Sequence, residues 1–127
     1  MAADALVVTQ REELDGFLDA VSREDADLRV DGALRYADTD LVPLRLAAAG
    51  KVQRFAADER GQLNESLRQV MGVFDNKGQR LLQHSVRVEG DHASVTTRVG
   101  DASYEQTVIY ELVHKGERWL IRGVRAL

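Results

Sequence analysis

The last third of the chain contains four short β-patterns, each separated from the next by a turn signal. The patterns cover residues 79–90, 92–99, 104–114 and 118–127. The gaps contain Gly90-Asp91, Gly100-Asp101 and Lys115-Gly116, which are pairs typical of hairpin turns. This spacing predicts a continuous antiparallel meander at the end of the chain, and it limits the possible folds more than any other feature.

The first half of the chain is typical of helices. Thr9 and Glu12 have capping-box spacing, and apolar residues at helical intervals follow them, which predicts an amphipathic helix over about 10–22. A second N-terminal signature at 22–25 predicts a short helix that ends near Tyr36. Helices that precede a meander are typical of an α+β domain, in which the helices pack on one face of the sheet.

The second predicted helix would bury Leu28 and Leu34. A third helix is predicted after Asp58, which is a good N-cap residue. Its apolar residues recur at helical spacing, and the turn at 75–78 ends it. These residues are Leu63, Leu67, Val70, Met71 and Phe74.

Residues 41–55 allow two interpretations. Val42, Leu44 and Leu46 alternate with other residues, which predicts a strand that turns at 49–51 and returns over 52–55. Pro43 would then lie on a sheet edge, where its missing N–H is harmless. The alternative is a helix that runs from about Leu44 through the alanines, and we favour the hairpin.

Alternation assigns the meander side chains to two faces of the sheet. One face of the first two strands carries Leu82, His84, Val86, Val88, Ala93, Val95, Thr97 and Val99. In the third strand, Val108, Tyr110 and Leu112 lie opposite Ile109 and Val113. In the fourth, Trp119, Ile121 and Leu127 lie opposite Leu120, Val124 and Ala126. Apolar residues on both faces predict that a second copy of the chain covers the outer face, as in a homodimer.

The order of elements resembles the nuclear transport factor 2-like (SnoaL-like) superfamily over about 10–127. The local likeness lies in 24–28 followed by 35–38, in 88–95, and in 108–118 with Trp119 and Ile121. The resemblance implies one domain over 1–127, with 1–8 as a flexible N-terminus. It implies an α+β roll of order α-α-β-β-α-β-β-β-β, in which a strongly bent, mostly antiparallel sheet and the helices surround a cavity.

Members of that superfamily include isomerases, epoxide hydrolases, cyclases and dehydratases, and also non-catalytic binding domains, so the fold alone does not choose a function. Steroid-isomerase-like members carry an aspartate in the strand that corresponds to 41–46, and this chain has no carboxylate there. The resemblance therefore favours a binding module over an enzyme.

The candidate ligand-binding residues are Tyr36, His84, Tyr110 and Trp119. His84, Tyr110 and Asp38 are also the candidates for catalysis, because a histidine or a phenol on an apolar face could move a proton. Each has a plainer interpretation: a core histidine, core aromatics, and a turn at a helix end where Asp38 and Asp40 bond locally.

The composition excludes several function classes. A net charge of −4 argues against nucleic acid as the main partner, and the absence of cysteine removes disulfides and thiolate sites. No apolar stretch is long enough for a bilayer, and no phosphate loop or metal-ligand spacing is present, so we expect no membrane association, cofactor or metal. The N-terminus lacks the features of a signal peptide, which favours a cytoplasmic protein over a mature exported domain.

The sequence therefore favours a non-catalytic module that binds a small apolar ligand or supports assembly. The alternative is a cofactor-free isomerase, cyclase or hydrolase with an acid–base residue in the cavity. A second alternative is a protein-interaction subunit, in which Arg118, Arg122 and Arg125 would contact an acidic partner.

Overall fold

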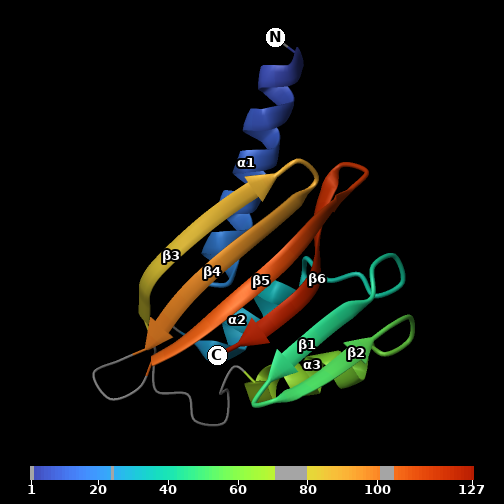
Figure 1. Ribbon diagram of the computed structural model, residues 1–127, viewed down its shortest axis with the longest axis vertical. Helices are drawn as coiled ribbons and strands as arrows, with labels where there is room; N and C mark the ends of the chain where they lie inside the picture. Colours follow the sequence, from blue (N-terminus) through green and yellow to red (C-terminus); the bar gives the residue numbers. More distant parts are fainter. Residues whose placement is uncertain (1, 24, 71–79, 101–104) are drawn as a thin grey trace.

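The computed structural model describes residues 2–23, 25–70, 80–100 and 105–127, with side chains from residue 11 on except at residue 26. Three helices and six strands occupy these ranges in the predicted order (Figure 1). They are α1 (Ala2–Ala20), α2 (Ala26–Leu34), β1 (Leu44–Ala48), β2 (Lys51–Phe55), α3 (Arg60–Val70), β3 (Arg80–Glu89), β4 (His92–Gly100), β5 (Glu105–Lys115) and β6 (Arg118–Ala126). None of these helices is both long and apolar enough to cross a membrane.

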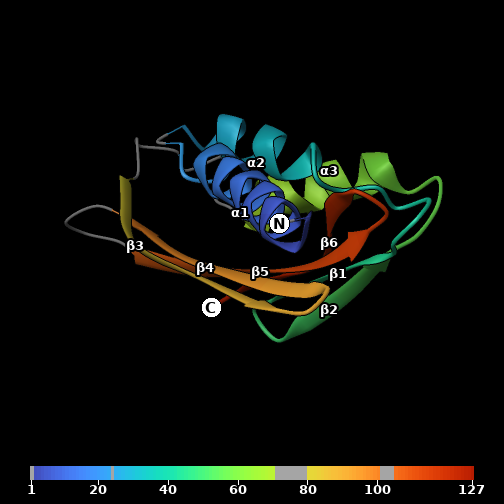
Figure 2. The same cartoon turned by 90° about the horizontal axis from the view of Figure 1, so that it is seen from above.

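The strands form one sheet in the order β2-β1-β6-β5-β4-β3. Neighbouring strands are antiparallel except β1 and β6, which pair in parallel. The sheet bends, and α1, α2 and α3 all lie on the same face of it (Figure 2). This arrangement confirms the predicted α+β class, in which the helices share one face of the sheet.

Residues 41–55 form the hairpin and not the helix. Leu44 pairs with Phe55 and Ala48 with Lys51, and the turn uses positive φ angles at Ala49 and Gly50. The prediction that Pro43 lies on a sheet edge is wrong, because β1 has β2 on one side and β6 on the other. Pro43 instead precedes the first paired residue, so its missing N–H removes no sheet hydrogen bond.

The helix ends differ from the predicted ones. Helix α1 begins at Ala2 and not near residue 10, since 2–10 contains neither proline nor glycine to stop it. Helix α3 begins after Glu59, whose carbonyl accepts the Leu63 N–H at 3.0 Å, while Asp58 has φ 68° and is not the N-cap. The predicted continuation of this helix to Met71 and Phe74, and the stop at 75–78, lie outside the described residues.

Helix α2 begins at Ala26, directly after the predicted signature at 22–25, and it does not have its predicted face. Asp25 is the N-cap, and its carboxylate accepts the Asp27 N–H at 2.8 Å. Leu34 is buried as expected, but Leu28 is 50% exposed. The buried face of α2 is instead made by Arg29, Val30, Ala33 and Leu34. A helix places positions four apart on one side, so this set leaves Leu28 facing solvent.

A β-bulge in β6 changes the predicted faces of that strand. Gly123 pairs with Glu111 and Ile121 with Leu112, so Arg122 is an extra residue without a partner. The bulge returns Val124 to the same face as Ile121, and Val124 is buried in the same core. The prediction that Val124 and Ala126 lie opposite Trp119 is therefore wrong.

The bulge also alters the argument for a homodimer. The apolar residues left on the outer face at this end of β6 and β5 are Leu120 and Val113, and both pack with Val42 in a small buried cluster. The loop before β1 thus covers part of the outer face that a second copy was expected to cover. Self-association remains a prediction.

A second bulge lies in β3, where Leu82 is the extra residue between Leu81 and Gln83. Leu81 therefore takes the inner position that alternation assigned to Leu82, which is 44% exposed. Beyond the bulge the prediction holds, because His84 pairs with Thr97 and Val86 with Val95. The predicted inner residues of β4 are all buried: Ala93, Val95, Thr97 and Val99.

Polar side chains fix the helices to one another. Arg60 of α3 donates to the carbonyls of Leu34 and Ala37 at 2.8 and 2.6 Å, which satisfies backbone groups at the end of α2. Arg68, further along α3, forms ion pairs with Asp27 and Asp31 of α2. These contacts therefore hold α3 beside α2.

Glycine in α2 is required by close packing, which gives a direct test of the helix arrangement. A Cβ at Gly32 would lie 2.3 Å from the Ala20 carbonyl oxygen, whereas a Cβ at Gly61 in α3 would contact nothing within 4 Å. We expect Gly32→Ala to lower the free energy of unfolding by about 3 kcal/mol through overpacking. Gly61→Ala should raise it by about 0.5 kcal/mol, because it restricts the unfolded chain.

Urea unfolding, followed by the fluorescence of the single tryptophan, measures both values. Equal effects of the two substitutions would contradict the packing of α2 against the end of α1.

Candidate functional site

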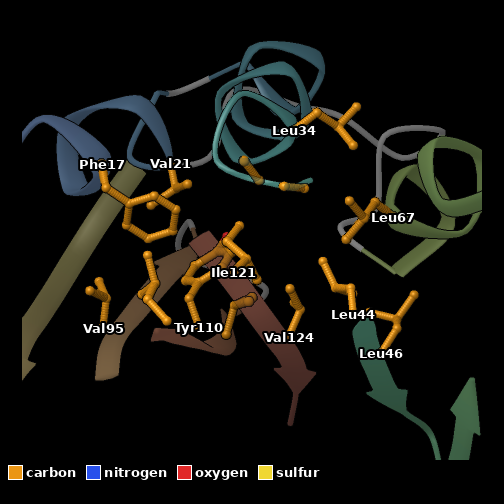
Figure 3. Packing of buried hydrophobic residues seen from close by; sticks show 14 of the residues in the cluster. Phe17, Val21, Leu34, Leu44, Leu46, Leu67, Val95, Tyr110, Ile121 and Val124 are labelled. Carbon is orange, nitrogen blue, oxygen red and sulfur yellow. The ribbon is translucent and has the colours of Figure 1, made fainter. Parts of the chain in front are cut away.

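The region between the helices and the sheet is filled by aromatic side chains. Phe17 of α1 lies edge-on to Tyr110 of β5, with ring centroids 5.2 Å apart, and edge-on to Tyr36 at 4.9 Å. Figure 3 shows Phe17 pointing from α1 toward Tyr110, with Val95 beside them on the sheet. Tyr110 is 1% exposed and Trp119 is fully buried. Tyr110 and Trp119, two of the predicted ligand-binding residues, therefore belong to the buried core.

Tyr110 is confirmed on the inner face, but its phenol is not tuned for proton transfer. Burial raises the pKa of Tyr110 well above its ordinary value, and the nearby Arg29 opposes this only in part. A phenol whose pKa is raised stays protonated at neutral pH. Tyr110 can therefore donate a hydrogen bond, while action as a base is disfavoured.

Arg29 is the polar core residue that sequence reasoning missed. Its side chain is 2% exposed, and its Nη1 donates to the Arg23 carbonyl at 2.8 Å. Burial lowers the pKa of the Arg29 guanidinium, while Tyr110 and Asp25 act in the opposite direction. The available signal was its position, because Arg29 is four residues before Ala33 on the buried face of α2.

Tyr36 lies at the exit of α2, against α1. Its carbonyl accepts the Ile121 N–H at 2.8 Å. Its hydroxyl packs against Gly16 of α1, where an added Cβ would lie 3.4 Å from it. Burial raises the pKa of Tyr36, and the nearby Glu13 raises it further. Tyr36 therefore fixes β6 to the helix layer and remains protonated near neutral pH.

Asp38 belongs to the turn that follows Tyr36. Its Oδ1 accepts the N–H of Asp40 at 3.2 Å and that of Leu41 at 3.4 Å. This is the local hydrogen bonding that aspartate commonly supplies in turns. The structure does not bring the Asp38 carboxylate to Tyr110.

His84 lies on the predicted inner face of the sheet, but it is not in the apolar environment that was predicted for it. It lies on the same face as Thr97, yet it is exposed, because β3 is the edge strand of the sheet. It is not among the residues of the buried core that contains Phe17. The structure thus brings Tyr36 and Tyr110 together around Phe17, and leaves His84 outside.

Trp119 is held by its backbone. Its N–H donates to the Glu13 carboxylate at 2.9 Å, and the His114 ring packs against its indole at 4.9 Å. The indole Nε1 is buried and has no hydrogen-bond acceptor among the described residues. An unpaired buried donor costs roughly 1–3 kcal/mol, so Trp119 is kept at this place by packing.

A hollow of about 500 Å³ lies between α3 and the inner face of the sheet. Its lining residues are Leu46, Ala48, Ala49, Lys51, Gln53, Ser66, Gln69, Val70, Gln106, Ala126 and Leu127. Gln106 of β5 donates its side-chain N–H to the Val70 carbonyl at 2.8 Å and so fixes the end of α3 at the rim. The lining combines apolar groups with amides, one hydroxyl and the ammonium of Lys51, and it contains no aspartate or glutamate.

Two further hollows, of about 620 and 550 Å³, lie on the opposite face of the sheet. They share His92, Glu111 and Arg122. None of the four predicted ligand-binding residues lines any of these three hollows, so the predicted ligand contacts remain predictions. Within the described ranges, no group of three or more histidine, aspartate or glutamate residues could hold a metal ion.

No family model matches this sequence, and no curated protein matches it. Solved structures do match. One is described as a "putative ketosteroid isomerase" from Shewanella frigidimarina, with 15% identity, a TM-score of 0.62, and coverage of 91% of this chain and 92% of that one. A DUF4783 family protein from Bacteroides ovatus is 13% identical, with a TM-score of 0.64 and coverage of 87% and 90%.

A designed NTF2 protein with a long sheet is 17% identical, with a TM-score of 0.61 and coverage of 92% of this chain and 98% of the design. These likenesses confirm the nuclear transport factor 2-like fold, as the sequence resemblance implied. At such identities they show the fold alone, since this fold hosts unrelated functions.

The buried phenol gives a pH-dependent test of the core. The pKa of Tyr110 is raised in the folded chain and returns to about 10 on unfolding, so the unfolded chain loses this proton first. Stability that is fully present below about pH 10 should therefore fall as pH rises further, by up to about 1.4 kcal/mol per pH unit.

Urea unfolding between about pH 9 and about pH 11 measures this slope. Tyr110→Phe keeps the ring and removes the ionisable hydroxyl, so it should flatten most of the slope. Tyr36→Phe is the matched control and should change the slope less, because Tyr36 is only partly buried. A slope unchanged by Tyr110→Phe would contradict burial of that phenol.

Proposed function

We propose that this chain is a non-catalytic binding module that holds a small, uncharged, mostly apolar molecule in the hollow between α3 and the sheet. The observation that carries the proposal is the lining of that hollow. Leu46, Val70 and Ala126 supply apolar surface, and the amides of Gln69 and Gln106 supply neutral hydrogen-bonding groups. Binding sites for small molecules are concave and mostly apolar, with a few polar groups that orient the ligand.

The charge of the lining supports an uncharged ligand. Lys51 is the one charged residue in this lining, and it is exposed. An anionic ligand would meet a single solvated ammonium, and a cationic ligand would meet no aspartate or glutamate side chain. The hollow therefore suits a neutral molecule better than an ion.

The lack of carboxylates on the inner face of the described strands argues against catalysis. In the described strands, the register places no aspartate or glutamate on the face that the helices cover. Glu89, Glu105 and Glu111 all lie on the other face. Proton transfer in an apolar cavity needs a positioned acid or base, and Tyr110 is too weak an acid for that role at neutral pH.

The binding proposal is tested with a matched pair of substitutions in β1. Ala48 lines the hollow, whereas its neighbour Ala47 lies on the opposite face, and both are half-buried. Ala48→Phe should fill the hollow and weaken binding of the neutral apolar dye N-phenyl-1-naphthylamine by at least about tenfold, or about 1.4 kcal/mol. Ala47→Phe adds the same bulk outside and should leave binding unchanged.

Dye fluorescence titration gives the two dissociation constants, and circular dichroism confirms that both variants are folded. Equal binding by both variants would place the dye elsewhere and reject the hollow as the site. Turnover of a Δ5-3-ketosteroid by the wild-type protein, lost in Tyr110→Phe, would instead favour the isomerase alternative.

A further inference from the structure

We propose that the outer face of the sheet docks an extended acidic segment of a partner protein in a trough that crosses the strands. The trough consists of the two hollows that share His92, Glu111 and Arg122. The trough lies on the sheet face opposite the hollow beside α3, so it is independent of the proposed function.

The floor of the trough is set by one row of paired residues. The strand register aligns Arg54, Arg45, Gly123, Glu111, Ser94 and Arg87 across all six strands. Gly123 lies in the middle of this row, and a Cβ there would be 3.3 Å from the Glu111 Oε2 and 3.7 Å from the Arg45 carbonyl oxygen. Gly123 is buried, and its missing side chain leaves room for the Glu111 side chain beside it.

The length of the row indicates a chain segment as the occupant. Neighbouring strands are about 4.8 Å apart, so a row across six strands is about 24 Å long. An extended peptide rises about 3.3 Å per residue, so about seven residues would span it. An open trough of that length suits a peptide better than a compact small molecule, which binds in an enclosed pocket.

The charge of the trough indicates an acidic occupant. The hollow nearest β1 and β2 is lined by the cations of Arg45, Arg54, Lys115 and Arg122 and by the carboxylates of Asp91 and Glu111. Asp91 lies 3.5 Å from His92, and none of the described carboxylates forms an ion pair with Arg45, Arg54 or Arg122. Because the whole chain carries a charge of −4, this local excess of positive charge runs against the overall balance.

Two of these arginines are placed unfavourably for the isolated chain. Arg45 and Arg54 lie directly opposite each other on neighbouring strands, and like charges in such a pair destabilise a sheet. A carboxylate between them would remove the repulsion and could accept hydrogen bonds from both guanidinium groups. An anionic group of the partner therefore fits best at this end of the trough.

The rim of the same hollow is apolar. Leu41 is 66% exposed, and Val42, Pro43 and Val113 line the wall beside it. An apolar side chain next to the carboxylates of the partner would cover Leu41. The chemistry that matches the trough is thus an extended segment with acidic and apolar residues in alternation.

The test selects short random peptides displayed on phage against the wild-type protein. Selected peptides should be enriched in aspartate or glutamate together with apolar residues. Their affinity, measured by fluorescence anisotropy, should fall roughly tenfold in the triple variant Arg45→Gln, Arg54→Gln and Arg122→Gln, since several partly exposed ion pairs are lost together. Rising salt should weaken binding to the wild type.

The matched control is the triple variant Arg98→Gln, Arg118→Gln and Arg125→Gln. All three are exposed and lie outside the lining of the trough, so the control removes the same net charge. Arg98 and Arg125 lie on the outer face, while the Arg118 Nη2 donates to the Arg35 carbonyl at 3.2 Å. Its affinity for the peptides should change less than about twofold. An equal loss in both triple variants, or selected peptides without acidic residues, would overturn the proposal.

Light scattering tests whether a second copy of the chain occupies the trough instead of a partner protein. It compares the wild type with the trough variant, Arg45→Gln, Arg54→Gln and Arg122→Gln. A dimer in the wild type that becomes a monomer in the trough variant would mean that a second copy fills the trough, and this would also overturn the proposal. Circular dichroism shows whether the exposed substitutions leave the fold intact.

Discussion

The extra residue in β6 is the feature on which the rest of the core depends. A strand with strict alternation would have to turn either Ile121 or Val124 away from the helices. The bulge at Arg122 lets both point inward, so Ile121 pairs with Leu112 and Val124 pairs with Tyr110. The bulge also places Gly123 on the outer face, opposite Glu111. One inserted residue thus determines which β6 residues lie on each face of the sheet.

The separation of charges decides which chemistry the fold can support. All described aspartates and glutamates are at least partly exposed, whereas one arginine, Arg29, is buried beside Tyr110. The interior therefore contains a cation and a phenol, both in their protonated forms at neutral pH, and no fully buried carboxylate among the described side chains. Such an interior can bind or orient a polar group, but proton abstraction in it is disfavoured.

Sequence reasoning succeeded where local chemistry determines structure. The meander and the hairpin at 41–55 were predictable because each turn has its own residue signature, and the buried set of β4 was predictable because that strand has no bulge. It failed in part of β3 and of β6 because an extra residue reverses the facing on one side of the bulge and leaves almost no trace in the sequence. Gly123, an isolated glycine inside a strand pattern, was the one available signal.

The candidate site was less predictable for a different reason. Alternation gives the face on which His84 lies, but not whether a helix covers that part of the face. The buried face of α2 was hard to predict because it includes Arg29, which no hydrophobic pattern would select. The pattern instead favoured Leu28, which is exposed. The hollow beside α3 depends on how α3 packs over β1, and this is a tertiary property that no single segment encodes.

Strand β1 connects the two proposed sites. Leu46 and Ala48 face the hollow beside α3, while Arg45 faces the trough on the other side. Pairing with β2 and β6 holds β1 on both edges, so its two rows of side chains keep fixed positions. A strand fixed in this way presents alternate residues to two independent surfaces, so the two proposed sites share one short segment without sharing a side chain.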